Sequence, residues 1–273
     1  MSEFDFLSKV TLGQYFPTAS ILHRLDPRVK IAGFTLLILA FTFSSSRIGL
    51  ALGILVVLFG ILISKVNPGF ALKGLLPPLP FLLIIALLQV FFVEAGSDSD
   101  VLFTLGRLQV TSTGLWAGTI LLMRFIGLIL ALSLASFCIS NTEMISGMAL
   151  LLKPLNRMGL RTDDLVMVIQ VMLRFIPFLA QTAERIAKAQ ASRGADWQGT
   201  KRGLFTRIKQ VVPLIIPLFV ISLRRSENMA LAMDARAYGN RRNRTSLYEF
   251  RLKPQDWLFI LLIITTSLAV FCL

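Results

Sequence analysis

The chain has 273 residues, of which 55% are hydrophobic and 16% are charged, and its mean hydropathy is +0.73. Soluble domains usually contain about 25% charged residues, so the composition argues against a water-soluble globule. The formal net charge is +13, which in a more polar chain would suggest nucleic acid. With a single histidine and two cysteines, the chain supports neither a disulfide framework, nor a metal cage, nor most histidine-dependent catalysis.

Five apolar stretches approach the roughly 20 residues that a helix needs to cross a bilayer. They are residues 31–45, 48–64, 75–93, 115–139 and 257–273. The first two are short and are separated by the polar sequence SSSR, which predicts a tight helical hairpin. His23 precedes the first stretch, where we expect it to help cap the helix.

The distribution of Lys and Arg predicts the orientation of these spans. The third loop, residues 94–114, contains Arg107 against three acidic residues, whereas residues 140–256 contain 19 Lys and Arg against nine Asp and Glu. We therefore expect the N-terminus and residues 140–256 to face the cytoplasm. The third loop and the C-terminus are expected outside.

Two further apolar segments, residues 164–180 and 211–223, have the composition of spans. If both crossed the bilayer, residues 181–210, with a net charge of +5, would lie outside and would break the positive-inside rule. Both segments are also interrupted by prolines. We predict long helices at the cytoplasmic face instead, and five spans rather than seven.

The predicted fold is an all-α integral membrane protein with about five transmembrane helices. Residues 1–139 hold the N-terminal segment and spans 1–4, and residues 255–273 hold span 5. Between them, residues 140–254 form a cytoplasmic domain with one short and two long helices.

The two long cytoplasmic helices repeat one pattern at a shift of 43 residues. An acidic residue, two alanines and an arginine recur at the same offsets, starting from Glu184 and from Glu227. Each arginine has small neighbours, which would let a partner's backbone approach while the guanidinium binds a carboxylate. The alternative is that arginine complements the helix dipole and alanine only favours helix. The residues concerned are Ser192, Arg193, Gly194, Ala235, Arg236 and Ala237.

An ordered set of motifs resembles the T component, the EcfT-like transmembrane coupling subunit of energy-coupling factor (ECF) importers. The set begins with GQYFPTASILHRLDPRVK at 13–30, LLKPLNRMGL at 151–160 and RFIP at 174–177. AERIAKAQASRGAD at 183–196 and LRRSENMALAMDARAYG at 223–239 follow. The family's two coupling helices each carry an Ala-Arg-Gly-like motif, from which this chain departs at Ser192 and Ala237.

The resemblance implies a non-catalytic subunit of a four-part importer, without a cofactor of its own, in a prokaryotic plasma or inner membrane. It would bind two ABC-type ATPases through Arg193 and Arg236, and a substrate-binding membrane subunit from the side. The amino-terminal signature is more similar to the shared type, which serves several vitamin-specific partners, than to the cobalt or biotin type. The transported substrate is not readable from this chain, because the partner selects it.

The absence of a phosphate loop in the sequence agrees with ATP hydrolysis in partner subunits. The nearest string, GADWQGTK at 194–201, has threonine before lysine instead of after it. Arg124 is the one charge well inside a predicted span. We expect it to be a structural anchor, bonded to a backbone carbonyl, to Gln89 or to the third loop, or else a contact for the substrate-binding partner.

Two other functions remain open from the sequence. A self-sufficient secondary transporter would place ionisable groups or broken helices near the midplane, and Arg124 alone is weak support for one. A membrane-anchored nucleic-acid-binding protein could use the basic block, but the block has no recognisable binding module, so nucleic acid is not an expected partner.

Overall fold

The computed structural model describes residues 15–92, 101–105, 108–154, 159, 162–194, 204–239 and 252–272. Side chains are described in these ranges except at 101–105, 108–110 and 204–210. The chain divides into two compact units. Unit 1 comprises Met1–Leu12 and Arg161–Glu249, and unit 2 comprises Gly13–Leu160 and Phe250–Leu273.

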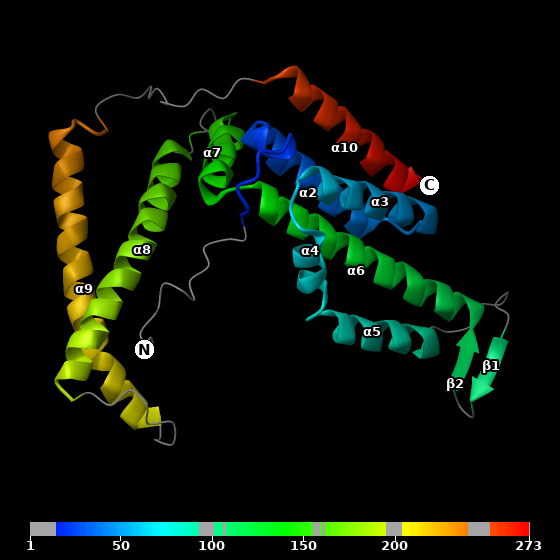
Figure 1. Cartoon of the computed structure of the whole chain (residues 1–273), viewed down its shortest axis with the longest axis horizontal. Helices are drawn as coiled ribbons and strands as arrows, with labels where there is room; N and C mark the ends of the chain where they lie inside the picture. Colours follow the sequence, from blue (N-terminus) through cyan, green and yellow to red (C-terminus); the bar gives the residue numbers. More distant parts are fainter. Residues whose placement is uncertain are drawn as a thin grey trace. The chain divides into compact units, whose positions relative to one another are not determined.

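Unit 2 is a helical bundle with one short hairpin (Figure 1). The 3-10 helix η1 (Leu22–Arg24) leads into α2 (Pro27–Phe43) and α3 (Arg47–Ile63). Next come α4 (Pro68–Leu75), α5 (Leu79–Phe92) and the antiparallel strands β1 (Val101–Leu105) and β2 (Leu108–Thr111). The unit ends with α6 (Ser112–Cys138), α7 (Asn141–Leu152) and α10 (Pro254–Cys272). The class is all-α, as predicted. The β-hairpin in the third loop was not predicted.

The bundle helices begin where a polar side chain can accept a hydrogen bond from the first turn. Asp26 caps α2, Ser46 caps α3, Asn67 caps α4 and Thr111 caps α6. Ser140 caps α7 in a capping box, in which the N3 glutamate also bonds back to the cap. Asp26, and not His23, therefore caps α2.

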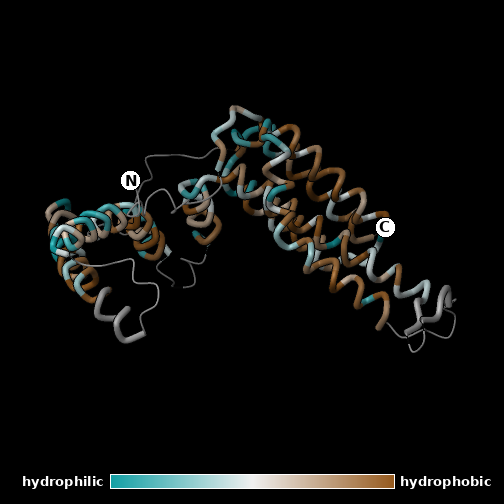
Figure 2. The backbone as a smooth tube through the Cα atoms, turned by 60° about the horizontal axis from the view of Figure 1, so that its bottom comes forward, coloured by the Kyte–Doolittle hydropathy of each residue, from teal (hydrophilic) through white to brown (hydrophobic). Residues whose placement is uncertain are grey.

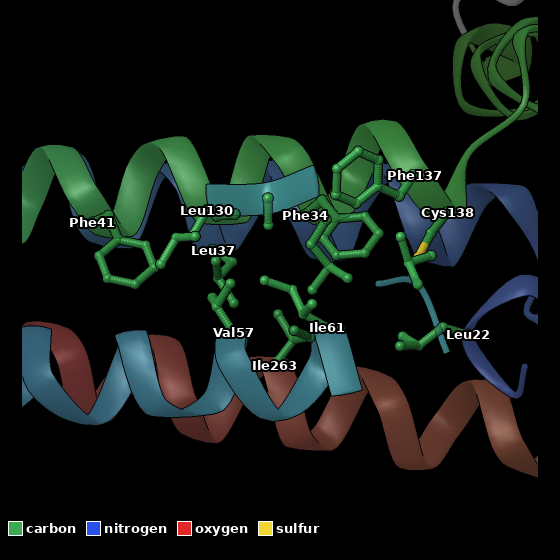
Figure 3. Packing of buried hydrophobic residues seen from close by; sticks show 14 of the residues in the cluster. Leu22, Phe34, Leu37, Phe41, Val57, Ile61, Leu130, Phe137, Cys138 and Ile263 are labelled. Carbon is green, nitrogen blue, oxygen red and sulfur yellow. The ribbon is translucent and has the colours of Figure 1, made fainter. Parts of the chain in front are cut away.

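The core of unit 2 lies between α2 and α6 on one side and α3 and α10 on the other (Figure 3). Phe41, Leu50 and Ala131 are 0% exposed at its centre, and Val57 and Ile61 pack with them at 1%. Elsewhere the bundle helices present apolar residues outward. Because most of their residues, inward and outward, are apolar, these helices are brown along most of their length in Figure 2. Apolar residues inside and outside are what a bilayer protein requires.

A helix lies at each of the five predicted spans. By length and composition α6 and α10 can each cross a membrane, and α4 with α5 can do so as one span bent by 55°. Pro77 and Pro78 lie in the break between α4 and α5. The helices α2 and α3 have 17 residues each, about 25 Å at the usual helical rise.

Unit 1 contains two long helices, α8 (Thr162–Ser192) and α9 (Leu204–Ala235), which contact each other. They run in opposite directions, and their C-terminal ends lie at opposite ends of the pair (Figure 1). The Arg225 guanidinium of α9 lies 5.1 Å from the Phe178 ring of α8. By length and composition α8 also meets the requirement for a span, so its predicted cytoplasmic position stays a prediction.

Candidate functional site

The arginines selected from the repeat occupy the same position at the ends of α8 and α9. Arg193 directly follows Ser192, the last residue of α8, and Arg236 directly follows Ala235, the last residue of α9. Both arginine side chains are exposed. Within the described ranges neither guanidinium takes part in an ion pair. Each helix therefore ends in an available cation that carries five hydrogen-bond donors.

The backbone turns in the same way after each arginine. Gly194 has a φ of +87° and Ala237, its counterpart in the repeat, has a φ of +55°. At α9 the Ala237 amide donates to the Asp234 carbonyl at 2.8 Å, and the Tyr238 amide donates to the Met233 carbonyl at 3.0 Å. This pair of bonds is the Schellman motif, which satisfies the last carbonyls of a helix.

The first of these bonds recurs at α8, where the Gly194 amide donates to the Ala191 carbonyl at 2.9 Å. The left-handed conformation that follows each arginine explains why glycine suits this position. Ala237 adopts the same conformation at a cost of roughly 1–2 kcal/mol because of its Cβ. The departure of Ala237 from the Ala-Arg-Gly-like motif therefore changes the side chain but keeps the backbone geometry.

The rest of α8 and α9 exposes apolar side chains in stripes. On α8, Leu165, Val168 and Met172 are 51–59% exposed at a spacing of three or four residues. On α9, Ile215, Phe219 and Leu223 are 49–64% exposed at a spacing of four residues. Such spacing places each set on one helix face. Apolar surface of this extent indicates a protein or lipid partner.

A second cluster, which the sequence did not reveal, centres on Lys30 in unit 2. As a whole residue Lys30 is 0% exposed, although lysine is rarely buried without a partner. Its Nζ lies 3.2 Å from both carboxylate oxygens of Glu143 on α7. Nζ also donates to the carbonyls of His23, at 2.8 Å, and Cys138, at 3.3 Å. The ammonium thereby ties η1, α2, α6 and α7 together.

His23 extends this cluster by bonding the end of α6. Its Nε2 lies 3.2 Å from the Phe137 carbonyl, which can only accept, so Nε2 carries a proton. Ser20 Oγ lies 2.7 Å from His23 Nδ1. Tyr15 packs near the His23 ring, and burial together with the Glu143 carboxylate raises the pKa of its phenol. The imidazole thus has a structural role.

A buried carboxylate next to the cluster joins the two ends of unit 2. Asp256, in the first turn of α10, is 1% exposed. Its Oδ1 accepts from the Asp26 amide at 2.9 Å, and its Oδ2 accepts from the Lys253 amide at 2.6 Å. The amino-terminal motif at 13–30 therefore contains residues that join η1 and α2 to α6, α7 and α10. No local sequence signal indicated this cluster, because the burial of its charges depends on contacts between distant residues.

Arg124 lies in α6 and bonds to the turn between α2 and α3. Its Nη2 donates to the Ser44 carbonyl at 2.6 Å. A backbone carbonyl was one of the three partners considered from the sequence. Arg193 and Arg236 belong to unit 1, and Arg124 belongs to unit 2.

Comparison with known proteins places the chain in a family. The family model described as CbiQ, Cobalt transport protein, matches residues 18–247. Three relatives are each named Energy-coupling factor transporter transmembrane protein EcfT. That of Listeria innocua is 38% identical over 264 residues, covering 97% of this chain and 96% of the relative. Those of Thermosediminibacter oceani and Clostridium kluyveri are 32% and 35% identical, each covering 92% of both chains.

These similarities extend over nearly the whole chain and confirm the resemblance drawn from the ordered motifs. They cover both the helical bundle of unit 2 and the arginine-ended helices of unit 1. The chain therefore belongs to the CbiQ/EcfT family, the transmembrane components of energy-coupling factor transporters.

Proposed function

We propose that this membrane subunit transmits ATP-driven motion from two ATPase subunits to a substrate-binding membrane subunit during vitamin or micronutrient uptake. The observation that carries the proposal is the repeated end of α8 and α9. Each helix ends in an exposed arginine followed by a left-handed residue, Gly194 or Ala237. Because the two ends lie at opposite ends of the helix pair, each can engage its own ATPase (Figure 1).

In this proposal Arg193 and Arg236 each bind a carboxylate in a groove of an ATPase subunit. Their small neighbours (Ser192 and Gly194, Ala235 and Ala237) let the partner's backbone approach. A guanidinium binds a carboxylate through two parallel hydrogen bonds, so the contact also fixes orientation. The ATPases can then move α8 and α9 as levers.

The region 140–254 faces the cytoplasm in this proposal, the C-terminus lies outside, and the apolar stripes of α8 and α9 face lipid and the substrate-binding subunit. The excess of 19 Lys and Arg over nine acidic residues in 140–256 supports this orientation. Within that region α7 packs against α2 in unit 2, so only α8 and α9 belong to unit 1.

The test is the double variant Arg193→Glu/Arg236→Glu in a co-expressed transporter. Removing one partner of a buried hydrogen-bonded charge pair costs about 2–5 kcal/mol, and reversing the charge adds repulsion. We expect the variant to reach the membrane but to lose copurification with the ATPases and to lose uptake.

The matched control is Arg185→Glu/Arg224→Glu, which makes the same charge change at exposed positions of the same helices. It should assemble normally. Assembly and uptake by the Arg193/Arg236 variant, or equal loss in the control, would contradict the assigned docking role.

The alternative of a self-sufficient secondary transporter is tested by uptake into liposomes that contain this chain alone. The coupling proposal predicts no uptake. The best candidate for an intramembrane ionisable site in the alternative, Arg124, bonds the Ser44 carbonyl, which supports an anchoring role.

A further inference from the structure

An open cavity of about 830 Å³ lies in unit 2 where the turn between α2 and α3 meets α6 and the end of α10. Its lining combines polar and apolar residues. The polar lining residues are Ser45, Ser46 and Arg47. The apolar lining residues include Phe43, Ile120 and Phe271.

Arg47 brings a cation to this cavity with its donors unused. Its guanidinium carbon lies 3.4 Å from the centre of the Trp116 ring of α6. Stacking occupies the face of a guanidinium and leaves the N–H groups at its edge available. Among the described residues Arg47 has no hydrogen bond and no ion pair through its side chain.

Arg124 supplies a second cation next to the cavity. It lies on the same face of α6 as Trp116 and Ile120, each one turn apart, and its Nη2 bonds the carbonyl of Ser44. Its Nε is buried and has no partner in the described part of the chain. A buried guanidinium N–H without an acceptor is costly, so an acceptor supplied from outside the chain would stabilise it.

The N-terminus of α3 adds a third positive element. Ser46 is the N-cap of this 17-residue helix, and its hydroxyl accepts from the Gly49 amide at 3.4 Å. The first amides of a helix and its dipole attract anions. Among the described residues, no acidic side chain lines the cavity. The polar part of the lining therefore combines the Arg47 guanidinium, two serines and a helix N-terminus, and Arg124 bonds Ser44, the residue just before this lining.

We propose that this cavity binds the phosphate of an anionic phospholipid. The headgroup would lie against Arg47 and the two serines, and the acyl chains would lie along the apolar lining residues. Phe43, Ile48 and Phe271 are 62–67% exposed there and need an apolar cover, which free phosphate would not supply. Helix ends and a tryptophan are typical of the headgroup level. Arg47 and the nearby Arg124, with no acidic side chain among the described lining residues, favour a lipid of net negative charge over a zwitterionic one.

The test is native mass spectrometry of the full chain in detergent, titrated with phosphatidylglycerol or with phosphatidylcholine. We expect one phosphatidylglycerol to be retained in preference to phosphatidylcholine. Arg47→Gln should weaken this binding about tenfold, as expected for the loss of a charge-assisted hydrogen bond. Arg47→Lys should recover part of it, since the charge remains but the planar fork is lost.

The matched control is Lys73→Gln. Lys73 is likewise an exposed cation over an aromatic ring, 5.8 Å from the centre of Phe70, but it does not line the cavity. It should bind phosphatidylglycerol like the unchanged chain. Equal retention by the Arg47→Gln variant, or equal affinity for both lipids, would overturn the proposal.

A third titration with inorganic phosphate separates the two sources of phosphate. If inorganic phosphate does not displace the bound phosphatidylglycerol, the result supports a lipid site. If phosphate displaces phosphatidylglycerol with the same concentration dependence from the Lys73→Gln and Arg47→Gln proteins, the result overturns the proposal. The site does not depend on the ATPases, so its failure would leave the proposed coupling function untouched.

Discussion

The two units differ in where their polar and apolar groups find partners. Unit 2 buries a lysine, an aspartate and an aromatic core, and the Lys30 ammonium and the Asp256 carboxylate find their partners within it. In α8 and α9, Ala187 is the one buried apolar residue among the described side chains, and the arginines at both ends point to solvent. Unit 2 thus has a buried core of its own, whereas α8 and α9 expose surface that is available to partners, which the proposed coupling function requires.

The largest expected difference in stability between the two units comes from removing the lysine of the ion pair in each. In unit 2, Lys30 and Glu143 have side chains 1% and 26% exposed, whereas in unit 1, Lys188 and Glu184 are 61% and 17% exposed. Lys30→Met should cost about 3–5 kcal/mol, since it leaves a largely buried carboxylate unpaired. Lys188→Met should cost about 0.3–0.5 kcal/mol, the usual value for an exposed i,i+4 pair. Thermal unfolding of the full chain in detergent measures both.

The double variant Lys30→Met/Glu143→Gln checks the cause. Glutamine keeps the capping box of α7 but removes the unpaired charge. It should therefore be more stable than Lys30→Met alone. Equal losses at Lys30 and Lys188 would show that the two units do not differ in this respect.

The next largest effect concerns packing within unit 2. A Cβ at Gly127 of α6 would overlap the Phe41 ring in the core. Gly127→Ala should cost about 1–2 kcal/mol, after allowing for the gain in helix propensity. Gly74→Ala on α4 is the control, because its Cβ would meet Ser133 Oγ at 3.4 Å, an ordinary contact. Unfolding midpoints should fall for the first variant and stay or rise for the second.

The smallest effect is a pair of opposite changes in unit 1. Gly194 and Ala237 share the left-handed conformation, but a Cβ at Gly194 would meet nothing within 4 Å, so only backbone strain matters there. Gly194→Ala should destabilise the end of α8, and Ala237→Gly should stabilise the end of α9, by about 1 kcal/mol each. Hydrogen exchange of the capping amides should change about fivefold in opposite directions. Changes of the same sign would contradict the shared geometry.

Apolar runs were predictable because they depend on neighbours in the sequence. The helices at the five predicted spans, the helices around 164–180 and 211–223, and the equivalence of Arg193 with Arg236 all came from local spacing. The bend of 55° between α4 and α5, where Pro77 and Pro78 lie, was not predicted. The hairpin β1–β2 was missed because its strands lie in a loop that was read only for charge.

The cluster around Lys30 was not predictable, because its partners are distant in the chain. Glu143 lies 113 residues from Lys30, and Asp256 lies 230 residues from Asp26. Each residue alone reads as an ordinary charge at a helix end. Only their joint burial shows that the amino-terminal motif holds the bundle together.

The sequence by itself therefore determined the membrane class, the family and the equivalent positions of Arg193 and Arg236 in the repeat. Apolar length, charge distribution and motif order are properties of the chain. The tertiary structure decided that α7 belongs with the bundle, that Lys30 is buried against Glu143, and that Ala237 takes the conformation of Gly194. A buried charge is stable only where several donors and acceptors converge, and convergence is a property of the folded chain.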